Sequence, residues 1–167
     1  IILCAGDIID NESKSDKGTI EFLNSLSEIA EVYFSLGNHE LEYTDSKQLI
    51  EDIKNTGAKV LDKEYLDIEV NGNTIRIGGM YDYAFSQETG DIDQETMKSD
   101  VYSFLTEMKQ TSSFQLMMAH RPDSFIFGNA YKWNFDLVVS GHYHGGQVIL
   151  PYIGGLYAPE LGWFPEV

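Results

Sequence analysis

The sequence has a single cysteine, Cys4, among its 167 residues. A lone cysteine excludes an internal disulfide and a cysteine-rich zinc site. No apolar run reaches the roughly 18 residues that a membrane-spanning helix needs, and no signal peptide is recognisable within the sequence. Proline is scarce, with 4 residues, and no proline- or serine-rich linker divides the chain. We therefore expect a single domain over residues 1–167.

Basic residues are also few. Lysine and arginine total 11, against 27 aspartate and glutamate residues, for a formal net charge of −16. This charge repels phosphate backbones over the general surface and argues against nucleic acid as a partner. The acidity could concentrate divalent cations or only aid solubility, and composition leaves both open. With 43% hydrophobic and 13% aromatic residues, the chain is not intrinsically disordered.

Short apolar runs alternate with segments of helical periodicity. Strands are expected at 1–5, 32–36, 59–61, 66–70, 74–77, 114–119, 135–139 and 147–150, and helices at 18–30, 45–57 and 93–108. Asn71-Gly72-Asn73 is a hairpin signal between two of the strands. Strands and helices alternate early and antiparallel pieces follow. This order predicts an α/β layered fold, a β-sandwich flanked by helices.

Polar clusters follow four of the apolar runs. In α/β folds functional groups gather in the loops beyond the carboxyl ends of the strands. All four histidines of the chain, His39, His120, His142 and His144, follow an apolar run or lie in a glycine-rich turn, and none is expected on a helix face. Any one of them could be a structural histidine, but together they favour metal ligands. If the backbone is extended, His142 and His144 point to one side, within reach of one metal centre or two adjacent ones.

Carboxylate and amide groups accompany these histidines. Asp7 ends the first run, and its two oxygens could bridge two cations or cap the loop. Asn38 offers a neutral oxygen ligand, and its neighbour His39 can point towards a substrate instead. Glu40 is either a ligand or the cap of the next helix, and we favour the cap. Oxygen and imidazole ligands without thiolates suit Mn, Fe, Zn or Ni.

Four motifs then resemble those of the calcineurin-like metallophosphoesterases. They are Gly6-Asp7-Ile8-Ile9-Asp10, Gly37-Asn38-His39-Glu40, the His120 segment and Gly141-His142-Tyr143-His144. Their order and spacing are similar to the family pattern over nearly the whole chain. The stretch Gly145-Gly146-Gln147, followed by Leu150-Pro151, resembles a bacterial GHxHGGQ-type branch whose members are often membrane-associated or exported.

The resemblance implies an α/β/β/α sandwich with a binuclear centre of two divalent metal ions. Asp7 would bridge the two ions. Asn38, His120 and His142 would complete the ligands of the second ion, and His144 would bind the first. The family usually supplies an Asp-x-His pair on the first strand, just before the point where this sequence begins, and residues 1–6 contain none. We therefore expect this sequence to be incomplete at its N-terminus and to lack a closing piece of sheet at its C-terminus.

The resemblance also implies a reaction. It is hydrolysis of a phosphomonoester or phosphodiester by a metal-activated hydroxide, with His39 as the acid that protonates the leaving group. Asp10 would support and orient His39. The implied substrate is a small-molecule or lipid-linked phosphoester. Membrane association would depend on a segment upstream of Ile1.

Other classes of function stay open on sequence grounds. One is a metal-binding or regulatory domain that keeps the second metal site without catalysis, although a purely structural site has no need of His39. A zinc hydrolase of amide bonds is less favoured because no HExxH motif is present. A plain interaction domain is a third possibility. Two further residues attract attention: Tyr143 is expected near the metals, and Arg121 either contacts phosphate or lies on the surface.

Overall fold

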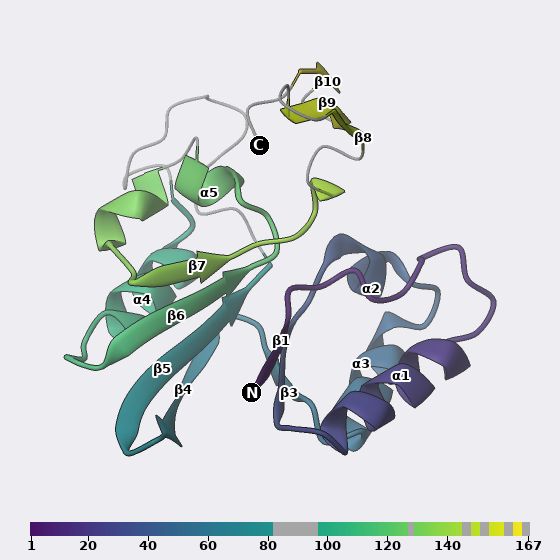
Figure 1. Cartoon of the computed structure of the whole chain (residues 1–167), viewed down its shortest axis with the longest axis horizontal. Helices are drawn as coiled ribbons and strands as arrows, with labels where there is room; N and C mark the ends of the chain where they lie inside the picture. The colour runs from purple at the N-terminus through teal and green to yellow at the C-terminus, as the bar shows by residue number, and fades with distance from the viewer. Residues whose placement is uncertain (82–96, 127–128, 145–147, 151–153, 159–161, 165–167) are drawn as a thin grey trace.

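The structure, a computed structural model, describes residues 1–81, 97–126, 129–144, 148–150, 154–158 and 162–164. Two of the three sheets that these residues form lie face to face with helices on their outer faces, which makes four layers, and the third is a small separate sheet formed by residues 148–150, 154–158 and 162–163 (Figure 1). The predicted α/β sandwich with flanking helices is therefore confirmed. Among the described residues, no helix combines the length and apolar character needed to cross a bilayer.

The first sheet is parallel throughout. It contains β1 (Ile2–Cys4), β2 (Val32–Ser35) and β3 (Lys59–Leu61) in that order, and its outer helices are α1 (Lys17–Ser27) and α3 (Ser46–Asn55). Side chains of β2 alternate between the two faces of the sheet. Val32 and Phe34 pack with Leu23 of α1 and Leu49 of α3. Asp45 caps α3 as expected, its carboxylate accepting from the Gln48 amide at 3.3 Å.

The second sheet mixes strand directions. Its order is β4 (Glu64–Val70), β5 (Asn73–Met80), β6 (Phe114–Ala119) and β7 (Leu137–Val139), with the first pair antiparallel and the others parallel. Helix α4 (Ser99–Met108) covers the outer face, where Val101 and Leu105 pack with Met117 of β6. The helix expected over 93–108 is thus confirmed from Ser99 onward, and residues 93–96 lie outside the described part of the chain.

The two sheets meet through a separate apolar layer. Tyr33 and Leu61 of the first sheet pack against Ile77, Leu116 and Met118 of the second. Leu116 and Met118 point inward while Met117 points towards α4, the alternation that a sandwiched strand requires. This layer fixes the distance between the ends of the two sheets.

The hairpin between β4 and β5 closes as predicted. Val70 pairs with Asn73, so Asn71 and Gly72 form a two-residue turn with φ of 51° and 77°. Two successive positive φ angles are those of the tight turns that match strand twist.

Several short elements were not predicted. They are α2 (Asn38–Glu42), α5 (Asp123–Ile126), the 3₁₀ helix η2 (Asn129–Trp133), and the strands β9 (Gly154–Ala158) and β10 (Gly162–Trp163). Strand β9 pairs antiparallel with β8 (Val148–Leu150) on one side and with β10 on the other, which makes a third, three-stranded sheet. A helix of four or five residues makes little more than one turn, which is too short to show helical periodicity. The strand expected at 135–139 begins only at Leu137. At Asp136 the backbone amide donates to the Gln115 carbonyl oxygen at 3.1 Å, and the Asp136 carboxylate accepts from the Gln115 amide at 2.8 Å.

Gly79 of β5 lies directly against Leu61 of β3. A Cβ atom there would lie 2.6 Å from the Leu61 carbonyl oxygen, which is backbone and cannot swing aside. We predict that Gly79→Ala lowers the free energy of unfolding by about 1–3 kcal/mol through overpacking. Gly18→Ala is the matched control, since Gly18 has open space around it in α1 and alanine should stabilise that helix by up to about 1 kcal/mol. Urea unfolding tests this, and equal midpoints for the two variants would contradict it.

Candidate metal centre

Loops from both sheets meet at one end of the sandwich. The His39 amide donates to Asp7 Oδ1 at 2.9 Å, which joins the loops after β2 and β1. On the second sheet the ladder continues past the strands, since the His120 amide donates to Met80 and the Gly141 amide to His120, both at 3.1 Å. His120 Nδ1 lies 2.5 Å from the Ala5 carbonyl oxygen of the first sheet. The expected convergence of strand ends is therefore present.

Four of the predicted ligands come together there. The ligand atoms of Asp7, His120 and His142 all lie within 4.8 Å of one another. Asn38 Oδ1 lies 3.3 Å from His120 Nε2 and 3.0 Å from His142 Nδ1. Asp7 Oδ2 is 3.2 Å from His120 Nε2. The four side chains thus surround one point, although they are separated by up to 135 positions in the chain (142 − 7).

The hydrogen bonding of His120 suits a metal ligand. The ring is fully buried, and Nδ1 faces the Ala5 carbonyl oxygen, to which only a protonated nitrogen can donate. In the neutral ring Nε2 is then an acceptor, and it faces the oxygens of Asp7 and Asn38. Such a cluster of acceptors fits a divalent cation, and the Nδ1 to carbonyl contact is the usual support for a ligating histidine.

Two glycines allow the loops to approach. A Cβ atom at Gly6 would lie 2.6 Å from both the Gly37 nitrogen and His120 Nδ1, and one at Gly37 would overlap the Asp7 carboxylate. Gly6 and Asp7 also have left-handed φ angles of 87° and 55°. Glycine adopts this conformation without strain, and aspartate tolerates it better than most residues.

Asp7 is held as a carboxylate. Partial burial opposes its ionisation. When the His120 ring is protonated, its hydrogen bond and positive charge, together with the hydrogen bond from the His39 amide, outweigh burial and lower the pKa of Asp7 below its usual value; a cation bound to Nε2 would take the place of that proton. An ionised carboxylate at neutral pH is the state that ligates a cation.

His39 lies beside this cluster without joining it. The expectation that no histidine lies on a helix is wrong for His39, which occupies the first turn of α2. Its Nδ1 is 3.2 Å from the Ile9 carbonyl oxygen and 3.4 Å from the Asn11 amide. Asp10 is exposed, and its Oδ1 accepts from the Glu12 amide at 3.0 Å. Backbone groups therefore make the described contacts to His39 Nδ1, and support from Asp10 stays a prediction.

The extended geometry expected for residues 142–144 is wrong. His142 and His144 have φ of 63° and 51°, so the chain turns sharply at both. His144 is exposed and is not part of the three-residue group found among the described residues. Its assignment to the first metal stays a prediction, and Gly145-Gly146-Gln147 lies outside the described residues.

Tyr143 anchors the loop that carries His142. Its side chain is 3% exposed, and its hydroxyl donates to the carboxylate of Asp123 in α5. Its ring centroid lies 5.1 Å from that of His142, which agrees with the expected position near the ligands. Asp123 itself was not anticipated, because an aspartate after Pro122 reads as an ordinary helix start.

Arg121 belongs to an aromatic stack next to the centre. Its guanidinium lies 5.6 Å from the Tyr81 ring centroid, and Tyr81 stacks on His120 at 6.1 Å. A contact between Arg121 and phosphate stays a prediction.

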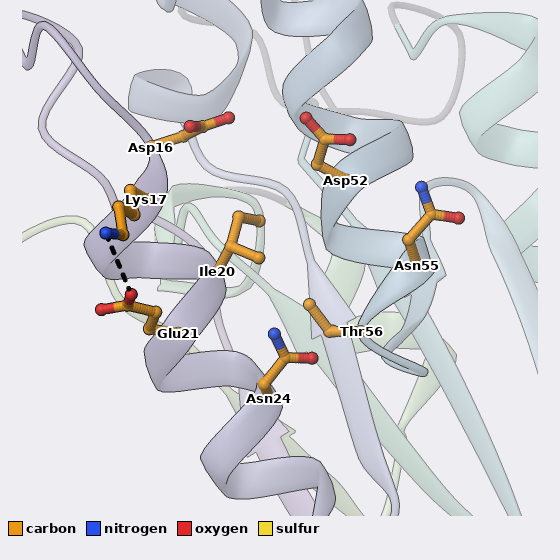
Figure 2. Close-up of a pocket in the computed structure, with 8 residues that line it drawn as sticks. All are labelled: Asp16, Lys17, Ile20, Glu21, Asn24, Asp52, Asn55 and Thr56. Atoms are coloured by element: carbon orange, nitrogen blue, oxygen red, sulfur yellow. Dashed lines mark ion pairs between the residues drawn. The ribbon is translucent and has the colours of Figure 1, made fainter.

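A separate hollow lies between α1 and α3. It has a volume of about 350 Å³ and is lined by Asp16, Lys17, Ile20, Glu21, Asn24, Asp52, Asn55 and Thr56 (Figure 2). Lys17 pairs with Glu21 at 3.6 Å within its wall. None of the candidate ligands lines this hollow.

The chain belongs to the calcineurin-like phosphoesterase family, whose model matches residues 1–146. A metallophosphoesterase of Campylobacter jejuni without assigned function is 28% identical over 148 residues, covering 89% of this chain and 36% of the relative. The phosphodiesterase YaeI of Escherichia coli is 28% identical over 162 residues, covering 95% of this chain and 54% of its own length. The chain thus spans about a third to a half of these relatives.

A solved structure supports the fold. The crystal structure of a candidate 5′-nucleotidase from Staphylococcus aureus superposes with a TM-score of 0.51 at 17% identity, covering 88% of this chain and 34% of that one. At this identity the likeness concerns the fold alone.

Replacing His142 tests the geometry of the cluster. We predict that His142→Ala in the full-length protein weakens Mn²⁺ binding by more than about 100-fold, beyond the usual cost of losing a supporting group. His144→Ala removes the same kind of side chain from an exposed position outside the three-residue group. It should leave the binding of Mn²⁺ by Asp7, Asn38, His120 and His142 unchanged. Titration calorimetry measures the Mn²⁺ affinity of both variants. An equal loss of affinity in both would refute the assignment of His142 as a ligand of this cluster.

Proposed function

We propose that the protein hydrolyses phosphoesters with the aid of two divalent metal ions. The observation that supports this most is the convergence of Asp7, Asn38, His120 and His142 from four separate loops in a member of the calcineurin-like phosphoesterase family. The Escherichia coli relative carries the name phosphodiesterase, which makes a phosphodiester the first substrate class to test. A phosphomonoester is the second.

The ligand set suits an anionic substrate. Asp7, Asn38, His120 and His142 would hold one ion, and Asp7 could extend its second oxygen to another ion with His144. A bound divalent ion supplies positive charge for phosphoryl oxygens and acidifies a water molecule. Since Asp7 is the only anionic group among the four ligands, the loaded site keeps a net positive charge. That local field would attract a phosphoester despite the overall charge of −16.

His39 is the group we assign to proton donation. Its Nδ1 lies 3.2 Å from the Ile9 carbonyl oxygen and 3.4 Å from the Asn11 amide, so the ring is oriented by Ile9 when Nδ1 carries a proton and by Asn11 when it does not. In the protonated imidazole Nε2 carries the second proton, which can pass to a leaving alkoxide near neutral pH. Because His39 is not a ligand in this scheme, its loss should affect chemistry and not metal binding.

His39→Ala tests the acid role. We predict that kcat for an alkyl phosphodiester falls about 10²- to 10⁴-fold, the usual contribution of general acid catalysis. The loss should be much smaller for a p-nitrophenyl ester, whose leaving group departs as a stable anion without a proton. Metal content, measured by mass spectrometry, should stay at the wild-type level. An unchanged rate on the alkyl ester would rule His39 out as the acid.

Metal removal tests the function itself. We predict that full-length protein loaded with Mn²⁺ hydrolyses a phosphodiester, loses activity with a chelator and recovers it when Mn²⁺ returns. Asp7→Asn should lose bound metal and activity together, whereas Asp16→Asn, the same change at the start of α1, should keep both. Protein that binds Mn²⁺ through Asp7 but hydrolyses neither diesters nor monoesters would instead be a metal-binding or regulatory domain.

A further inference from the structure

Glu40 is a buried carboxylate surrounded by backbone amides. Its side chain is 0% exposed. Its Oε2 accepts from the Asp7 amide at 2.9 Å and from the Gly37 amide at 2.7 Å. Its Oε1 accepts from the amides of Ile8 at 2.8 Å and Ile9 at 3.4 Å.

These four donors belong to two different loops. Gly37 lies in the loop after β2, directly before Asn38, and the other three amides follow β1 around Asp7. A buried charged group is costly unless its hydrogen bonds are satisfied, and in the described part of the chain Glu40 has amides for this purpose and no ion-pair partner. One oxygen of Glu40 therefore ties together the two loops that deliver Asp7 and Asn38.

This arrangement exceeds what helix capping requires. Accepting from Gly37 alone would cap α2, which agrees with the favoured sequence interpretation of Glu40. The three bonds to residues 7–9 instead set the backbone of the loop where Asp7 has its left-handed φ of 55°. Both oxygens are occupied by amides, so Glu40 is not placed to act as a ligand.

We propose that Glu40 is a positioning residue that sets the affinity of the centre for divalent ions. By holding the Asp7 amide and the Gly37 amide on a single oxygen, it keeps the Asp7 carboxylate within reach of Asn38 and His120. The inference rests on the proposed metal centre and deepens it. It assigns no contact between Glu40 and metal or substrate.

The test replaces Glu40 in the full-length protein. Glu40→Gln keeps the shape but turns one oxygen into an NH₂ group, which faces amide donors and cannot accept from them. Glu42→Gln is the matched control, because Glu42 lies on the same helix, is exposed, and accepts from Asn11 Nδ2 at 2.9 Å. Glu40→Asp keeps the charge but is one methylene shorter, and it serves if the Gln variant does not fold.

Two readouts separate positioning from mere stability. For Glu40→Gln we expect Mn²⁺ affinity of the folded protein to fall about 10- to 100-fold, the cost typical of losing a supporting group. In metal-free protein, hydrogen exchange followed by mass spectrometry should accelerate in peptides that cover residues 6–9 and 37, and not in peptides from β6 or α4. Glu42→Gln should change neither readout, and Glu40→Asp should fall between wild type and Glu40→Gln.

Several results would overturn the inference. A lower melting temperature with unchanged Mn²⁺ affinity would make Glu40 a structural residue only, and so would exchange that rises evenly over the chain. Wild-type protein that does not bind Mn²⁺ would remove the centre and this inference with it. Wild-type protein that binds Mn²⁺ but hydrolyses no phosphoester would refute the proposed function, while the affinities of the Glu40 variants would still decide the positioning role.

Discussion

The loops after β1 and β2 touch through their backbones, and the geometry of the centre depends on that contact. A Cβ atom at Gly6 would meet the Gly37 backbone, and one at Gly37 would meet the backbone and carboxylate of Asp7, so neither position has room for a side chain. The amides around this contact point at the buried Glu40 carboxylate, and the His39 amide points at Asp7. Hydrogen bonds to charged groups in a buried setting are stronger than those between neutral groups. The side-chain carboxylates of Glu40 and Asp7 therefore hold the two loops together at a place where residues 6 and 37 have no room for side chains of their own.

The packing of the two sheets brings the other two ligands of the centre into place. Asp7 and Asn38 follow strands of the first sheet, whereas His120 and His142 follow strands of the second. The apolar layer of Tyr33, Leu61, Ile77, Leu116 and Met118 sets the spacing between these two pairs. Interiors pack too densely to absorb changes of volume without strain. Packing far from the ligands thus contributes to their geometry.

Much of this site could be predicted from residue type and position. Asp7, Asn38, His120 and His142 each follow an apolar run, and parallel strands end at one edge of a sheet, so their convergence could be anticipated. The expectation for His142 and His144 failed because it assumed an extended backbone, whereas both residues have positive φ. His39 was missed as a helical residue because α2 has only five residues and no periodicity to reveal it. The bond between Tyr143 and Asp123 joins residues 20 positions apart, and nothing local in the sequence signals it.

The sequence by itself determined most of the strands and helices and which chemical groups are available as metal ligands. Apolar periodicity specified which segments become strands and helices, and the scarcity of cysteine left carboxylate, amide and imidazole groups as candidate ligands. Only the tertiary structure decided which atoms face one another, because contacts between distant residues depend on how the layers pack and on turns such as those at His142 and His144, whose positive φ angles the sequence did not indicate. Glu40 shows the difference: its position predicts a helix cap, but the fold brings a second loop onto the same carboxylate.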